Sequence, residues 1–276
     1  MNIIRFIMAG CIMGMLGACA SNTVATYEPD NSDALNIMHA AGIDSNLKDT
    51  EVPKDTISSI TDSAGYGFAM AASGYKAPIP GVSSSQMAGM NFTAWLFSPT
   101  ADSARNSLFA WVPKDIAGDN AIDSLADILL EAASKAAKEL GYDPEISIPK
   151  NKTGTYLLMT RPGDEYCEKG SKYSCMIAFG LREAQKLKEA PDFVGTVGAN
   201  SFFDPSERSY SFFTFNKEYV GFNELELLVT TSKHLPKWVY FYVAPKNVRF
   251  NELDKMKIPA VVNQGKLLYF VKPASS

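Results

Sequence analysis

The sequence predicts an α+β fold, in which a mixed or mainly antiparallel sheet packs against a few helices. The longest intervals between predicted helices each contain several β-rich runs, which disfavours a doubly wound parallel sheet, where single strands alternate with helices. Apolar residues make up 46% of the 276 residues and charged residues 20%, which are values typical of a globular chain. We expect a single domain, with a division near residues 149–151 as the alternative.

The clearest predicted helix covers residues 120–140, where apolar side chains recur on one face and Gly141 follows as a stop. A second helix is predicted over 33–43, with Asp33 as its N-cap and Gly42 as its stop. The apolar stripe of the first helix is half alanine, so we expect another element to pack closely against it. That stripe consists of Ile122, Leu125, Leu129, Ala132, Ala136 and Leu140. The remaining helical patterns cover residues 57–72, 181–189 and 223–235.

β-rich runs occupy much of the remaining chain. Trp238–Val243 is apolar on both faces, which predicts a central strand covered on both sides. One hairpin is predicted between residues 91–97 and 108–112, and a second has a tight turn containing Gly265. The strands of this second hairpin are 260–262 and 267–271, and further strands are predicted over 155–160, 175–179 and 210–215.

The N-terminus has the pattern of an export signal. Arg5 is followed by an uncharged, mostly apolar stretch over Phe6–Ala20, after which the chain turns polar. This stretch is shorter than the roughly 20 apolar residues that span a bilayer. We therefore expect a secretory signal at this position and no membrane-spanning helix.

The end of this stretch, Leu16-Gly17-Ala18-Cys19, resembles the lipobox of bacterial lipoproteins. The resemblance implies cleavage before Cys19, lipid on the Cys19 sulfur and acylation of the new amino terminus, which together form a stable membrane anchor. Ala20 follows the cysteine where Asp would signal retention, which implies the outer membrane as the destination. Cys11 is the weaker alternative, because Met8 stands at the Leu position of its motif.

With this signal, the chain divides into a signal peptide (1–18), a lipidated polar tether (19–33) and an α+β periplasmic domain (34–276). Cys167 and Cys175 then remain in an oxidising compartment, on a polar loop. We predict that they form a disulfide, because neither a Cys-x-x-Cys redox motif nor a zinc-ligand set is present.

Composition excludes several classes of function. The formal net charge is −4 and no basic block occurs, which argues against binding of nucleic acid. The two histidines, His39 and His234, are interpreted as packing or surface residues, and we expect no metal site and no cofactor.

One pair of motifs resembles the penicillin-recognising serine enzymes, namely Ser73-Gly-Tyr-Lys76 and Lys152-Thr153-Gly154. In that family the serine and lysine lie one turn apart on a helix. Here Ala77-Pro78 follows Lys76 and ends any helix, and the third motif is missing. We therefore name no catalytic residue, although a periplasmic cell-wall hydrolase stays an alternative.

Aromatic residues are concentrated over 201–215, where Phe202 and Phe203 precede Asp204-Pro205 and Tyr210 follows. One interpretation is a turn whose aromatic residues contact a protein partner or stack on a glycan, and the other is strand residues that alternate into the core. Together with the lipobox, this leads us to expect a non-enzymatic binding or assembly component on the periplasmic face of the outer membrane. A glycan- or ligand-binding lipoprotein is the second alternative.

Overall fold

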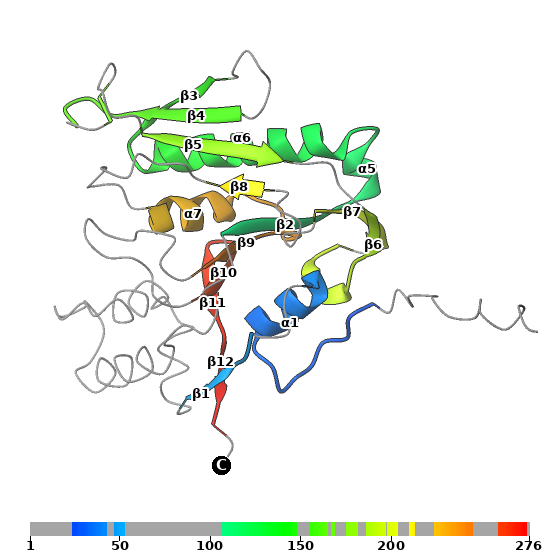
Figure 1. Cartoon of the computed structure of the whole chain (residues 1–276). Coiled ribbons are helices and arrows are strands. Elements are labelled where there is room, and N and C mark those ends of the chain that lie inside the picture. Colours follow the sequence, from blue (N-terminus) through cyan, green and yellow to red (C-terminus); the bar gives the residue numbers. More distant parts are fainter. Residues whose placement is uncertain are drawn as a thin grey trace, which may run out of the picture.

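The computed structural model describes residues 24–42, 47–52, 106–147, 155–164, 167–168, 175–181, 186–196, 198–203, 210–212, 224–244 and 259–274 (Figure 1). Within these ranges, no helix has both the length and the apolar character needed to cross a membrane. Several predictions fall on other parts of the chain and lie outside the described residues. They concern Cys11, Cys19, the helix over 57–72, the strand over 91–97, and the motifs at Ser73, Lys76 and Lys152.

The predicted α+β class is confirmed, and the main sheet is antiparallel throughout. It has the strand order β11-β10-β9-β2-β7-β6. These strands are β2 (Ser107–Val112), β6 (Lys186–Glu189), β7 (Ala199–Phe203), β9 (Val239–Val243), β10 (Ala260–Asn263) and β11 (Lys266–Tyr269).

Strand β9 is central, as its two apolar faces predicted, and all five of its residues are buried. It pairs with β10 on one edge and with β2 on the other, where Phe109 lies opposite Tyr240 and Leu108 opposite Phe241. The second predicted hairpin is also confirmed, since β10 and β11 pair antiparallel around the turn at Gln264 and Gly265.

A second antiparallel sheet has the order β3-β4-β5-β8, and a two-stranded parallel pair joins β1 to β12. The parallel pair connects the beginning of the described chain to its end, because Thr50 lies opposite Val271. The strands are β1 (Thr50–Val52), β3 (Asp143–Ser147), β4 (Thr155–Thr160), β5 (Met176–Leu181), β8 (Tyr210–Phe212) and β12 (Val271–Pro273).

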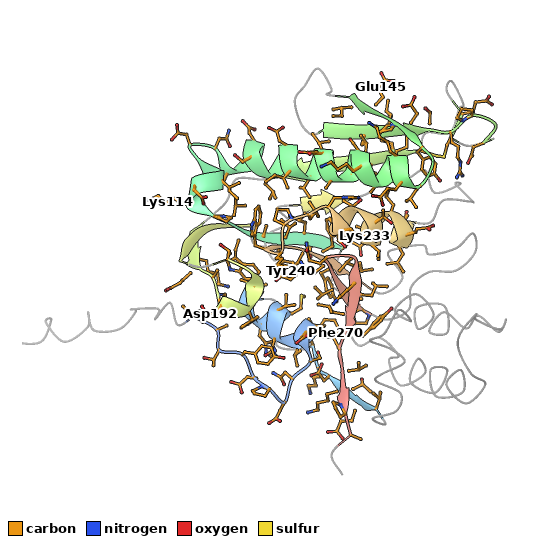
Figure 2. The ribbon with its side chains drawn as sticks, turned by 180° about the vertical axis from the view of Figure 1, so that it is seen from behind. Lys114, Glu145, Asp192, Lys233, Tyr240 and Phe270 are labelled. Carbon is orange, nitrogen blue, oxygen red and sulfur yellow. A yellow bond between two sulfur atoms is a disulfide. The ribbon has the colours of Figure 1, made fainter. Side chains whose placement is uncertain are left out.

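Helices cover both sides of the main sheet. In Figures 1 and 2, α6 and α7 lie on one side of it and α1 on the other. Helix α7 contacts β9, β10 and β11, whereas α6 packs on α7 and on the strands of the second sheet. The helices are α1 (Asp33–Ala41), α5 (Lys114–Ala117), α6 (Ala121–Glu139) and α7 (Glu224–Lys233), with a 3₁₀ turn η1 (Asp192–Val194).

The long helix α6 forms where its pattern predicted. The Asn120 side chain accepts hydrogen bonds from the backbone N–H groups of Ile122 and Asp123 and so caps the N-terminus. Gly141 follows the C-terminus with φ +80°, the left-handed conformation that ends many helices. The buried alanines of its stripe allow the close contact with α7, as expected.

Three local predictions differ from the structure. Residues 181–189 are not helical where the structure describes them, because Leu181 ends β5 and Lys186–Glu189 is the edge strand β6, paired with β7. Pairing with a neighbouring strand outweighs the weak helical preference of these residues. The cap of α1 is Ser32, and Asp33 is the first helical residue. The edges of β2 are occupied by β7 and β9, and its predicted hairpin partner lies outside the described residues.

Cys167 and Cys175 are paired as predicted, with their Cα atoms 5.2 Å apart and each residue 2% exposed. Backbone hydrogen bonds flank the pair, from the N–H of Met159 to the carbonyl of Cys175 and from the N–H of Arg161 to the carbonyl of Cys167. The disulfide therefore joins two chain segments that also hydrogen bond at the ends of β4 and β5.

Replacing both cysteines by serine (Cys167→Ser and Cys175→Ser) should lower the free energy of unfolding by about 2.5 kcal/mol, because the loop-closure entropy of the unfolded chain is restored. Urea unfolding of the variant and of the wild type measures the difference. Wild-type protein in dithiothreitol is the control and should match the variant. Equal stability of the oxidised and reduced wild type would contradict this prediction.

Candidate functional site

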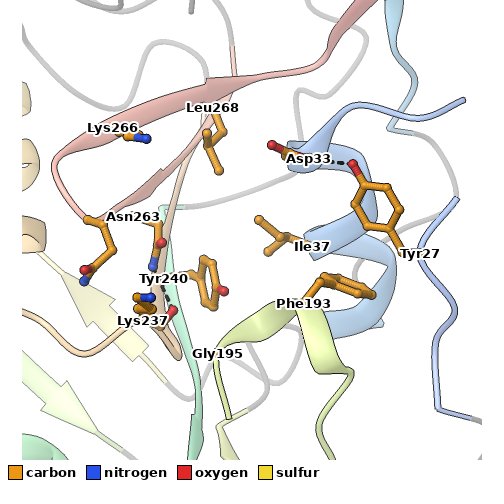
Figure 3. Close-up of a pocket in the computed structure, with 11 residues that line it drawn as sticks. Tyr27, Asp33, Ile37, Phe193, Gly195, Lys237, Tyr240, Asn263, Lys266 and Leu268 are labelled. Atoms are coloured by element: carbon orange, nitrogen blue, oxygen red, sulfur yellow. Dashed lines mark hydrogen bonds between the residues drawn. The ribbon is translucent and has the colours of Figure 1, made fainter. Parts of the chain in front are cut away.

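A pocket of about 400 Å³ lies between α1 and the β10–β11 hairpin (Figure 3). One wall comes from the N-terminal segment (residues 24–32), α1 and η1, and the facing wall comes from β9 and the hairpin. Its lining residues are Tyr27, Asp33, Ile37, Phe193, Gly195, Lys237, Tyr240, Asn263, Gln264, Lys266 and Leu268.

Helix α1 is held at both ends by side chains. At its N-terminus, Ser32 caps the N–H of Leu35, and the backbone N–H and hydroxyl of Ser32 donate to the Asp49 carboxylate at 2.6 and 2.5 Å. At its C-terminus, the Lys188 ammonium on β6 donates to the carbonyl of Ala40 at 2.5 Å. These contacts determine how α1 presents Asp33 and Ile37 to the pocket.

The buried side chain of Asn36, 2% exposed, fixes the N-terminal segment against α1. Its amide group donates to the carbonyl of Glu28 and accepts from the N–H of Glu28, both at 3.0 Å. A buried amide must be hydrogen bonded, so this reciprocal pair determines the position of the segment. The described end of the predicted 19–33 tether is thus bound to the domain.

Tyr27, next to this anchored residue, forms the outer wall of the pocket. Its hydroxyl donates to Asp33 Oδ1 at 2.8 Å, and its ring meets the edge of Phe193 with the centroids 5.4 Å apart. The hydrogen bond to Asp33 raises the pKa of Tyr27 above its ordinary value, and burial adds to the rise.

Tyr240 of β9 forms the floor. Its ring stacks on Phe109 at 5.3 Å, and its hydroxyl donates to the carbonyl of Val194 at 3.2 Å, so that β9 and η1 are joined at the base of the pocket. Burial raises the pKa of Tyr240 strongly, with a further contribution from the Asp33 carboxylate.

The hairpin turn positions the polar rim. Gln264 and Gly265 both have positive φ, +48° and +76°, the conformation of a tight two-residue turn. The Asn263 amide donates to the carbonyls of Lys237 and Val239 at 3.0 and 2.8 Å, and the Gln264 amide donates to that of Leu235. These bonds hold the turn against the start of β9.

The glycine at position 195 allows η1 to lie close to Lys237. A Cβ at this position would lie 2.6 Å from the Cβ of Lys237, and its φ is +82°. Any larger residue would therefore push η1 away from the rim of the pocket.

The charges of the pocket lie on opposite walls. Asp33 is on the α1 wall, whereas Lys237 and Lys266 are on the hairpin wall. Across the described part of the chain, neither lysine ammonium has an ion-pair partner, and Asp33 accepts the Tyr27 hydroxyl. Both ammonium groups are exposed and available to a ligand.

Among the described lining residues there is no serine, threonine, cysteine or histidine, and the two lysines lack the burial that would activate an amine as a nucleophile. Among the residues that the structure describes, no group of three or more potential ligands could hold a metal ion. The described lining offers a ligand charged, polar and apolar contacts.

The residues predicted from the aromatic concentration lie elsewhere. Phe202 and Phe203 are in β7, an interior strand of the main sheet, and Tyr210 is in β8 of the second sheet. The two phenylalanines are strand residues at the end of β7, the turn predicted at Asp204-Pro205 lies outside the described residues, and the role of the phenylalanines in partner contact stays a prediction. His39 is exposed on α1, whereas His234 Nε2 lies 2.7 Å from Glu139 Oε1. Neither histidine lines the pocket.

Sequence reasoning did not identify the pocket residues as a site. Tyr27, Tyr240 and Lys266 come from segments that only the fold brings together. The local signals were an isolated tyrosine in a polar segment and a lysine after a turn glycine, and both patterns are common on protein surfaces.

No known protein family, curated protein or solved structure matches this chain.

Tyr240→Phe tests the electrostatics of the pocket floor. At neutral pH the variant should lose about 1 kcal/mol of stability with the hydrogen bond to Val194. The raised folded-state pKa means that the unfolded chain releases the tyrosine proton first, so wild-type stability falls as the pH rises above about 10. The variant lacks this loss, and the difference between the two proteins should shrink between pH 8 and pH 11 in urea unfolding. A difference that does not change with pH would contradict the prediction.

Proposed function

We propose that this chain is a lipoprotein anchored in the outer membrane through Cys19, and that its periplasmic domain binds another envelope component in the pocket between α1 and the β10–β11 hairpin. The single observation that carries the binding role is the pocket itself. A volume of about 400 Å³, apolar walls and a few unpaired charged groups are the usual features of a small-molecule site.

The pocket is lined by both apolar and charged side chains, which favours a ligand with apolar and charged parts. Ile37 and Leu268 supply apolar surface, and Phe193 adds an aromatic ring. The charged groups stand at the rim, where they select a ligand by charge while the walls bury its apolar part. Among the described lining residues no serine, cysteine or histidine is present as a nucleophile, and the Asp33 carboxylate accepts the Tyr27 hydroxyl.

The predicted anchor fits the location of the pocket. Tyr27, which lines the pocket, follows Cys19 by eight residues. Eight extended residues reach about 27 Å at most, so an anchor at Cys19 would keep the pocket close to the membrane surface. Val24 and Tyr27, which are 38% and 42% exposed, lie on the side of the chain that leads to the anchor. A component at or near the membrane surface is therefore the expected ligand source.

The anchor is tested by Cys19→Ser, with Cys11→Ser as the matched control. We expect Cys19→Ser to move the protein from the membrane pellet to the soluble periplasmic fraction, with its disulfide intact on a non-reducing gel. The Cys11→Ser variant should stay with the membrane. Membrane retention of Cys19→Ser, or its loss in Cys11→Ser, would contradict the assignment of Cys19.

The binding role is tested by a photo-crosslinking residue at Leu268, which is half-buried in the pocket wall. The control position is Ile146, which is 51% exposed on β3 and does not line the pocket. We expect irradiated cells to give a defined envelope adduct at 268 and none at 146, resolved by mass spectrometry. Adducts at 146 with none at 268 would place the binding surface elsewhere.

A further inference from the structure

The two signs of charge in the pocket are separated across its apolar centre. Asp33 lies on the α1 wall, and Lys237 and Lys266 lie on the hairpin wall (Figure 3). The structure has no ion pair between Asp33 and either lysine, although all three line one pocket. A ligand that carries charge of a single sign would be attracted to one wall and repelled by the other. A ligand with a positive and a negative end can be attracted to both walls at once.

The size of the pocket sets the distance between the two ends. The pocket has a volume of about 400 Å³ and is open on one side, and an extended peptide advances about 3.4 Å per residue. The two charged groups of a free amino acid sit on one carbon atom, whereas those of two or three residues are separated by the peptide backbone and can face the two walls. The apolar side chains of Ile37 and Leu268 line the space between.

The polar groups near the hairpin suit a peptide backbone. The amide NH₂ groups of Asn263 and Gln264 donate to backbone carbonyls of the protein. Their side-chain oxygens are acceptors, which is the complement of a ligand N–H. The Tyr27 ring beside Asp33 offers an aromatic surface to an ammonium group.

We propose that this pocket binds a peptide of two or three residues with both termini free, its ammonium group at Asp33 and its carboxylate at Lys237 and Lys266. This proposal rests on the proposed function, because it names the ligand class of the same site. The apolar walls favour small or aliphatic side chains on the ligand.

The test uses the Cys19→Ser chain, with its lipid removed and its domain complete, in isothermal titration. The probes are alanyl-alanine, leucyl-leucine and trialanine, each compared with its N-acetylated and C-amidated forms. We expect at least one free peptide to bind, and each modification to weaken binding by about tenfold or more, because each removes one charge-assisted contact.

Variants assign each end of the ligand to its wall. In Asp33→Asn, N-acetylation should no longer change the affinity, whereas amidation still should. In the double variant Lys237→Gln and Lys266→Gln, the reverse is expected. Lys135→Gln, on the exposed face of α6, is the control and should leave every affinity unchanged. A thermal melt of each variant confirms that the fold is retained.

Two outcomes would overturn the inference. If no probe binds, or if the free and modified peptides bind equally, the pocket does not recognise a zwitterionic peptide. An adduct at Leu268 in the same protein would then show that the pocket still binds an envelope component of other chemistry. Failure of this proposal is thus distinguishable from failure of the proposed function.

Discussion

The burial of β9 on both faces is the constraint on which the rest of the described structure depends. A strand that is apolar on both faces is stabilised by pairing along its edges and by cover on both sides. Strands β2 and β10 supply the pairing, and α7 covers one side. On the other side, the buried Tyr240 donates its hydroxyl hydrogen bond to Val194 of η1 and forms the floor of the pocket. The pocket therefore lies directly over the central strand.

A second constraint connects this cover to the N-terminus. The buried amide of Asn36 exchanges two hydrogen bonds with the backbone of Glu28, which holds the chain there alongside α1. That placement brings Tyr27 over the pocket and shortens the free chain between the domain and the predicted lipid at Cys19. Under the proposed function, the same few residues complete the binding site and hold it near the membrane surface. The position of residues 24–32 would then matter both for ligand binding and for the distance of the pocket from the membrane.

Local sequence pattern was sufficient to predict an element whose conformation is fixed by interactions within that element. Helix α6 has an apolar stripe, a capping Asn120 and a stop at Gly141, and these act whatever surrounds it. The β10–β11 turn needs a residue such as Gly265 at positive φ. By contrast, the edge strand β6 forms by pairing with β7, and residues 186–189 have no strong preference of their own. The short strands β1 and β12 depend in the same way on a partner more than 200 residues away.

Pattern along the chain was enough to predict the α+β class, the central strand β9, the helices α1, α6 and α7, and the pairing of Cys167 with Cys175. Each of these follows from periodicity, caps or proximity along the chain. The location of the site follows from the folding of the chain, since Asp33 faces Lys266 across a pocket whose walls come from distant segments. Side-chain type indicates what chemistry a residue can perform, whereas separation along the chain carries no information about distance once the chain has folded. The pocket could therefore be recognised only after its two walls were placed.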